Sequence, residues 1–213
     1  PDGITWTAHA AAAQTPWYSI IYGNGLFVAS GAYGGVMTSP DGITWTARTA
    51  AGVLGWWYSV TYGNGLFVAV ADCFYGGPVC AMTSPDGITW TARTSTGVDS
   101  WSSVAYGNGL FVAISLYGAN RVMTSPDGTT WTAQPSAAQN PWTSVTSGNG
   151  RFVAVSYNGT NRAMSSSFST TTFSGTNQSI SGTLTGSSKL GNVVMGGSGT
   201  KTFSSNASTP NIR

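Results

Sequence analysis

The chain has 213 residues and carries little charge, since eight Lys or Arg, six Asp and one His give a net charge of +2. Only 7% of its residues are charged, against about 25% in an average soluble domain. It therefore lacks the basic stripe of a nucleic-acid binder and the spare carboxylates and histidines of an acid–base enzyme. No apolar run approaches the roughly 18 residues of a membrane span. We expect no nucleic-acid partner and no membrane span.

Three short motifs recur in the same order along the chain. Pro-Asp-Gly opens each unit, Gly-Asn-Gly lies in its middle and Met-(Thr/Ser)-Ser closes it. The four units begin at Pro1, Pro40, Pro85 and Pro126, which gives steps of 39, 45 and 41 residues. Four ordered copies establish an internal repeat, and a repeat of this length indicates a solenoid, a propeller or an array.

The second unit shows what one repeat contains. Apolar and aromatic runs alternate with Gly, Pro and Asn, and they lie within residues 40–48, 57–62, 66–70 and 81–84. These signals predict four strands, with Asn64-Gly65 as a tight hairpin turn. Four strands in about 40–45 residues are typical of one propeller blade. The continuous apolar run 66–70 suits a sheet that is packed on both faces.

The predicted fold is all-β, with residues 1–166 forming a β-propeller of four four-stranded blades. Residues 1–8 supply only the last strand of a blade, and residues 142–166 supply the other three strands. Pairing of these two segments would close the ring and remove its sheet edges. The alternative is a larger ring of which these four units are a part.

Residues 167–213 differ in composition, because they contain no Trp, no Asp and no Gly-Asn-Gly. They form a Ser/Thr/Gly-rich β segment with weak strands predicted at 170–175, 179–186, 192–196 and 200–205. A degenerate fifth blade and a separate β module both fit this pattern.

Two tryptophans recur in each unit, one after the Asp-Gly turn and one before the Gly-Asn-Gly. We expect both sets in the blade core or between blades. The first set is Trp6, Trp45, Trp90 and Trp131, and the second is Trp17, Trp57, Trp101 and Trp142.

The segments Ser39–Trp45, Ser84–Trp90 and Ser125–Trp131 resemble the Asp-box of sialidase-like β-propellers, with one residue fewer between Asp and Gly. The resemblance implies a structural hairpin turn whose aspartate accepts backbone N–H groups and whose aromatic residue packs into the blade. It assigns that turn to Asp2, Asp41, Asp86 and Asp127. The segment 173–186 resembles Ser/Thr/Gly-rich β repeats of bacterial surface proteins.

We predict no enzymatic activity, no catalytic residue, no metal site and no cofactor. The sialidases of the resembled family use a Tyr–Glu pair, and this chain has no Glu. Most glycosidases need two carboxyl groups at the scissile bond. The position of His9 in its unit holds Arg48, Arg93 and Gln134 in the others, which indicates an exposed polar position. Asp99 precedes Trp101 as Asn140 precedes Trp142, and we expect a turn residue there.

Cys73 and Cys80 enclose six residues in the loop between the second and third strands of one blade. A Cys on each arm favours a disulfide worth about 2–3 kcal/mol, with free thiols as the alternative. A disulfide indicates an oxidising compartment, so we predict an extracellular or cell-surface location.

Aromatic residues in the loops are the candidate ligand-binding side chains. These are Tyr33, Tyr75, Tyr117, Tyr157 and Trp56. Aromatic side chains presented by loops on a rigid scaffold suit stacking on sugars. We predict a non-enzymatic adhesive or glycan-binding module, with glycans, surface proteins or copies of itself as partners. The alternatives are a structural subunit of an extracellular fibre and, last, a glycosidase.

Overall fold

The computed structural model describes residues 3–52, 55–73, 77, 79–97 and 99–166, together with the backbone of four short strands between 170 and 203. The chain divides into two compact units, Pro1–Ser165 and Ser166–Arg213. Every regular element described in either unit is a β-strand. Within this described part, no helix is both long enough and apolar enough to cross a membrane.

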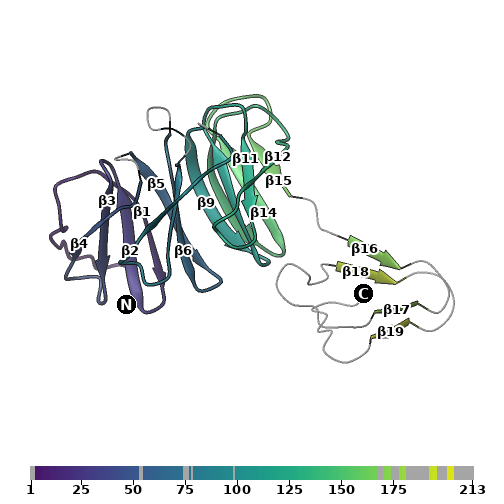
Figure 1. Cartoon of the computed structure of the whole chain (residues 1–213), viewed down its shortest axis with the longest axis horizontal. Helices are drawn as coiled ribbons and strands as arrows, with labels where there is room; N and C mark the ends of the chain where they lie inside the picture. The colour runs from purple at the N-terminus through teal and green to yellow at the C-terminus, as the bar shows by residue number, and fades with distance from the viewer. Residues whose placement is uncertain are drawn as a thin grey trace. The chain divides into compact units, whose positions relative to one another are not determined.

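The first unit consists of four antiparallel sheets that follow one another along the chain (Figure 1). We call them blades 1 to 4. Blade 1 contains β1 (Trp17–Gly23), β2 (Leu26–Gly31), β3 (Gly35–Ser39) and β4 (Thr46–Thr49). Blade 2 contains β5 (Trp57–Gly63), β6 (Leu66–Ala71), β7 (Ala81–Ser84) and β8 (Thr91–Arg93). Blade 3 contains β9 (Trp101–Gly107), β10 (Leu110–Ser115), β11 (Val122–Ser125) and β12 (Thr132–Gln134). Blade 4 contains β13 (Trp142–Gly148), β14 (Arg151–Ser156) and β15 (Ala163–Ser165).

The turn between the first two strands of each blade is an Asn-Gly pair. In blade 2, Asn64 has φ 51° and Gly65 has φ 74°, and the other three blades repeat this geometry. Two consecutive positive φ values define the turn that matches the twist of a β-hairpin, and Asn-Gly tolerates them best. The repeated dipeptide therefore sets the same register in every blade, with Gly63 opposite Leu66 in blade 2.

The hydrophobic core lies between successive blades. Val28 and Val36 of blade 1 pack in one cluster with Trp57, Phe67 and Trp90 of blade 2. Equivalent clusters join blade 2 to blade 3 and blade 3 to blade 4. Blades 2 and 3 are therefore covered on both faces, which explains the continuous apolar runs in their second strands.

A ladder of hydrogen bonds also links the innermost strands of neighbouring blades. The backbone N–H of Val60 donates to Ser19 Oγ at 3.1 Å. In the same way Val104 donates to Ser59 at 3.1 Å, and Val145 donates to Ser103 at 3.1 Å. Each serine is the third residue of its inner strand, so the repeat places one such bond at every junction.

The predicted all-β chain of repeated antiparallel sheets is confirmed, with one difference in blade 4. Blades 1 to 3 have four strands each, whereas blade 4 has three. In the described part of the segment, residues 3–8, the expected pairing with blade 4 is not formed: these residues belong to no strand, and Trp6 is 86% exposed. The reason is the order of the blades: β1 packs on β5, β5 on β9 and β9 on β13. Blades 1 and 4 are thus at opposite ends of the row (Figure 1).

The second unit pairs its strands in parallel. β16 (Thr170–Phe173) pairs with β18 (Asn192–Met195), and β17 (Gln178–Ile180) pairs with β19 (Lys201–Phe203). Parallel pairing cannot arise from the hairpin turns that build a blade. The described strands of this unit are therefore paired differently from those of the blades, and the choice between a degenerate fifth blade and a separate β module stays a prediction.

Candidate ligand-binding rim

The first unit has two rims that differ in their loops. On one rim, the segment before each inner strand meets the loop between the second and third strands: Asp72 N–H donates to Trp56 O at 3.1 Å, and Ser100 N–H donates to Tyr117 O at 3.1 Å. We call this side the loop rim. The opposite side, the turn rim, carries the Asn-Gly hairpins and the Pro-Asp-Gly turns, and Asn24 Nδ2 donates there to Pro85 O at 3.4 Å.

The predicted aromatic side chains that the structure describes are exposed on the loop rim. They are Tyr33, Trp56, Tyr117 and Tyr157. The structure brings two of them together, because the hydroxyl groups of Tyr117 and Tyr157 lie 2.8 Å apart. This hydrogen bond raises the pKa of Tyr157, with a further contribution from burial. Tyr75 lies outside the described residues.

Polar residues of the entry segments hold the aromatic loops in place. Asn120 Nδ2 donates to Asp99 Oδ2 at 3.3 Å, and a Cβ at Gly118 would overlap the Asp99 carboxylate. In blade 4, Asn140 occupies the position of Asp99, and its Nδ2 donates to Asn161 O at 2.6 Å. Asp99 is therefore a buried support for the loop that carries Tyr117, and its glycine neighbour allows the close approach.

Tyr33 occupies an unusual backbone conformation. Its φ is +56°, in the left-handed region that non-glycine residues seldom adopt. Gly34 follows with φ +74°, and its N–H donates to Gly55 O at 3.0 Å. Thr15 Oγ1 donates to Ala32 O at 3.1 Å from the other side of the loop. These bonds hold an exposed aromatic ring on a strained turn, which is a feature of functional sites.

A second aromatic group was missed by the sequence analysis. The rings of Tyr18 and Tyr58 lie 5.1 Å apart, and those of Trp56 and Tyr58 lie 6.1 Å apart in an edge-on arrangement. Burial raises the pKa of Tyr58, and the negative charge of Asp72 and the neighbouring Tyr18 add to the rise. We call these three rings the aromatic cluster. The signal was available, because Trp-Tyr-Ser occurs only in the first two units, at residues 17–19 and 57–59.

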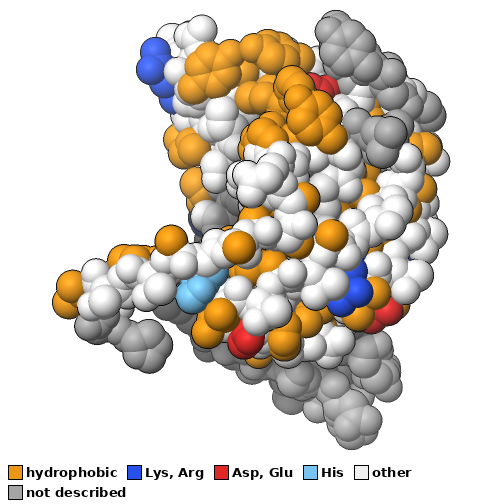
Figure 2. Space-filling model, turned by 90° about the vertical axis from the view of Figure 1, so that its left-hand side faces the viewer, with side chains coloured by type: hydrophobic (Ala, Val, Ile, Leu, Met, Phe, Trp, Pro, Cys, Tyr) orange, Lys and Arg blue, Asp and Glu red, His pale blue; other side chains and the backbone are white. Residues whose placement is uncertain are grey.

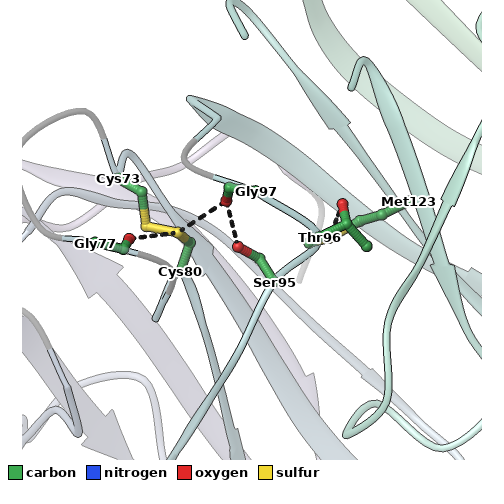
Figure 3. Close-up of a disulfide and its surroundings, with 7 residues drawn as sticks. All are labelled: Cys73, Gly77, Cys80, Ser95, Thr96, Gly97 and Met123. Carbon is green, nitrogen blue, oxygen red and sulfur yellow. Dashed lines mark hydrogen bonds between the residues drawn. A yellow bond between two sulfur atoms is a disulfide. The ribbon is translucent and has the colours of Figure 1, made fainter. Parts of the chain in front are cut away.

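A disulfide joins Cys73 and Cys80 between β6 and β7, with their Cα atoms 5.5 Å apart (Figure 3). Both cysteines are fully buried. The sulfur of Cys80 lies 3.4 Å from the carbonyl oxygen of Gly77 and 3.7 Å from that of Gly97. Gly97 belongs to the segment that leads into blade 3. The disulfide therefore closes the connection between β6 and β7, and Cys80 contacts the entry segment of the next blade.

The aspartates of the Pro-Asp-Gly turns lie on the turn rim. Asp41 Oδ1 accepts the backbone N–H groups of Ile43 and Thr44 and the hydroxyl of Ser39, each at 2.8 Å. Asp86 and Asp127 make the same backbone bonds. These hydrogen bonds lower the pKa of Asp41 and Asp86 to about 2. Asp2 lies outside the described residues.

The tryptophans differ in burial according to their place in the row. Trp57, Trp101 and Trp142 are fully buried, and Trp90 and Trp131 are nearly so. Trp17 and Trp45 are partly buried. Trp6 was expected in a blade core but is exposed, because residues 5–10 join no sheet.

His9 is also exposed. In the described part of the chain, no three or more His, Cys, Asp and Glu side chains are grouped so that they could hold a metal ion.

Comparison with known proteins identifies the fold. The chain matches no protein-family model and no curated protein sequence. Among solved structures it is similar to the computationally designed Ika4 protein, with a TM-score of 0.57 and 12% identity over 75% of this chain and 98% of Ika4. YCF48 bound to D1 peptide has a TM-score of 0.52 and 20% identity over 67% of this chain. YCF48 from Cyanidioschyzon merolae has a TM-score of 0.51 and 16% identity over 68% of this chain. The chain spans about half the length of both YCF48 chains.

These similarities and the repeated antiparallel sheets define the class of the first unit, which is a β-propeller. At identities of 12% to 20% these similarities show the fold alone and do not identify a ligand.

Proposed function

We propose that the protein is a non-enzymatic extracellular or cell-surface binding module whose loop rim binds glycans. The observation that carries the proposal is the grouping of exposed aromatic rings on that rim. Tyr117 and Tyr157 come from adjacent blades and are 54% and 56% exposed. Their rings and hydroxyl groups combine a flat apolar face with a polar edge, which suits the faces and hydroxyl groups of sugars.

The rigidity of the rim supports this proposal. The loops that carry the two tyrosines are held by Asp99 and Asn140, and in blade 2 a disulfide joins Cys73 to Cys80 between β6 and β7. A rim that is ordered before the ligand arrives loses little conformational entropy on binding. The disulfide also favours an oxidising compartment, and therefore an extracellular or cell-surface location.

The proposed absence of catalysis is supported by the structural use of four of the six aspartates. Asp41, Asp86 and Asp127 are committed to turns on the opposite rim, and Asp99 is buried beneath its loop. The turn hydrogen bonds also favour the Asp-box resemblance, in which the aspartate has a structural role. A glycosidase would need two carboxyl groups facing one scissile bond.

The test is a glycan array followed by titration of the best ligand. We expect the double variant Tyr117→Ala/Tyr157→Ala to lose at least about tenfold in affinity, as is typical of a central aromatic contact. Ile88→Ala is the matched control, because Ile88 is an exposed apolar residue on the turn rim. No glycan binding, or binding that the double variant retains, would contradict the proposal.

A peptide or protein partner is the second candidate. It is favoured by the structural similarity to YCF48, one structure of which is bound to D1 peptide. Replacement of Trp56 and Tyr18 by Ala would then weaken binding of an extended peptide. A peptide array beside the glycan array separates the two candidates.

A further inference from the structure

Three kinds of contact recur at the junctions between blades, and the residues equivalent to one side of each contact are exposed at the ends of the row. The first is the serine ladder, in which the backbone N–H of Val60, Val104 or Val145 donates to a serine of the preceding blade. In blade 4 the equivalent serine is Ser144, which is exposed. In blade 1 the equivalent of Val60 is Ile20, which is also exposed.

The second contact, found between blades 1 and 2 and between blades 2 and 3, is the close approach of a ring to the glycine that ends an inner strand. At the third junction Gly107 faces the side chain of Ser147. A Cβ on Gly23 would lie 2.3 Å from the Tyr62 ring, and a Cβ on Gly63 would lie 2.0 Å from the Tyr106 ring. Gly148 has the same place in blade 4, where a Cβ would meet nothing within 4 Å. The ring that matches Tyr62 in blade 1 is Tyr22, which is 57% exposed.

The third contact is the burial of the apolar side chains of each second strand. Val68 and Val70 of blade 2 are fully buried against blade 3. Their equivalents in blade 4, Val153 and Val155, are 40% and 46% exposed. At the other end, exposed hydrophobic side chains are visible on the blade 1 side of the molecule (Figure 2). The two ends therefore carry the complementary groups of a junction between blades.

Residues 3–9 extend this complementarity, because they hold the sequence of a missing strand. Residues 3–8 are Gly-Ile-Thr-Trp-Thr-Ala, identical to residues 87–92, which include most of β8 in blade 2. Among the described residues blade 4 has no fourth strand, so β15 is the outermost strand described in its sheet. The core cluster between blades 3 and 4 contains Trp142, whereas the other two clusters each contain a second tryptophan.

A hollow lies beside β15, where the fourth strand of blade 4 would run. It has a volume of about 500 Å³, and its lining includes Ala138, Trp142 and Met164. In blade 2 the fourth strand β8 occupies the corresponding space. Ala92 of β8 lies beside the segment before β5, since a Cβ added to Gly52 would be 3.5 Å from the Cβ of Ala92. The residue that matches Ala92 in the segment 3–9 is Ala8.

We propose that copies of this chain assemble head to tail, with blade 1 of one copy stacked on blade 4 of another and residues 5–9 of that first copy added to β15 as the fourth strand. The register follows from blade 2, where Met82 lies opposite Ala92 and Thr83 opposite Thr91. Met164 then lies opposite Ala8, and Ser165 opposite Thr7. His9 takes the position of Arg93, whose Nε donates to Thr83 Oγ1 at 2.9 Å.

A second copy is the occupant for two reasons. Within one chain, blade 1 and blade 4 are at opposite ends of the row, and the segment 10–16 connects residues 3–9 directly to β1. Within the chain, the outer strand β8 of blade 2 is followed directly by β9, the first strand of blade 3. In the same way, a second copy that adds residues 5–9 to blade 4 brings its own blade 1 against blade 4, so one placement of the partner makes both contacts. An interface of this head-to-tail type produces a closed ring of copies or an open filament. With a net charge of +2, copies repel one another little.

The first experiment is a change at Gly148. In a single chain a larger residue meets open space there, but in the assembly it would overlap Tyr22 of the second copy. We expect the mass of the wild-type chain in sedimentation velocity to rise with concentration, and Gly148→Val to remain monomeric with an unchanged Tm. Ala133→Val on the exposed β12 is the control and should assemble like the wild type. A wild-type chain that is monomeric at all concentrations would overturn the proposal.

The second experiment distinguishes a second copy from closure within one chain. The chain has two cysteines, and both are in the disulfide, so an introduced thiol is the sole free one. Thr7→Cys protein is mixed with Ser165→Cys protein under mild oxidation. We expect a disulfide-linked pair of chains, whereas Thr7→Cys mixed with Ala133→Cys gives none above background. If the mixture gives no linked pair and the double variant Thr7→Cys/Ser165→Cys gives a linked monomer, the proposed second copy is wrong.

Discussion

Residues 3–8 and residues 87–92 have the same sequence and different structures. In blade 2 the segment ends in β8 and buries Trp90 to 8% exposure between two blades. At residues 3–8 the segment joins no sheet, and Trp6 is 86% exposed. The difference shows that the box sequence alone does not hold the outer strand. A sheet edge and a preceding blade must be present to receive it.

The largest expected effect comes from breaking the buried copy of this segment. Trp90→Ala should destabilise the chain by about 3–5 kcal/mol, because it leaves a cavity between blades 1 and 2. Trp6→Ala, at the same position of the motif, should change the stability of the monomer by less than about 0.5 kcal/mol. Denaturant titration at low protein concentration measures both, and equal losses would contradict the difference between the two segments.

The disulfide is a second local difference between blades. Replacing Cys73 and Cys80 by Ser should cost about 2–3 kcal/mol, because the reduced chain gains conformational freedom in the unfolded state. The same loss should appear on adding a reducing agent to the wild type, and the double variant should not respond to that agent. Thermal unfolding with and without reductant checks this.

The glycines that end the inner strands test the difference between the junctions of blades and the two ends of the row. Gly63→Ala should cost about 1–3 kcal/mol, because its new Cβ overlaps the Tyr106 ring of the next blade. Gly148→Ala should leave the monomer's stability unchanged, because no side chain lies within 4 Å. Chemical unfolding of the two variants at low concentration measures the difference, which equal costs would refute.

The smallest expected effect is a dependence of stability on acid. Hydrogen bonds lower the pKa of Asp41 and Asp86 from 3.8 to about 2 in the folded chain. The stability that these carboxylates contribute is therefore present above about pH 4 and is lost as the pH falls toward 2. We expect the Tm to fall over this window, and to fall less steeply in Asp86→Asn. An identical slope in this variant would show that the turn bond does not contribute.

Part of the candidate site, the exposed loop tyrosines, could be predicted from the sequence. The repeat predicted exposed loop tyrosines, and Tyr117 and Tyr157 are exposed on one rim. Their hydrogen bond was not predictable, because it depends on how far adjacent blades are rotated. The Tyr18–Tyr58 contact was missed for a related reason: both lie in predicted strands, where an aromatic residue is usually taken as core.

The sequence by itself determined the elements of the propeller unit and their order. Asn-Gly turns, apolar runs and a period of about 40 residues depend on local backbone preferences, which neighbouring residues fully express. Tertiary structure decided which copies of a motif become strands and which rings meet. Residues 3–8 make the reason plain, because a strand needs a partner edge, and that edge lies on another sheet rather than in the segment's own sequence.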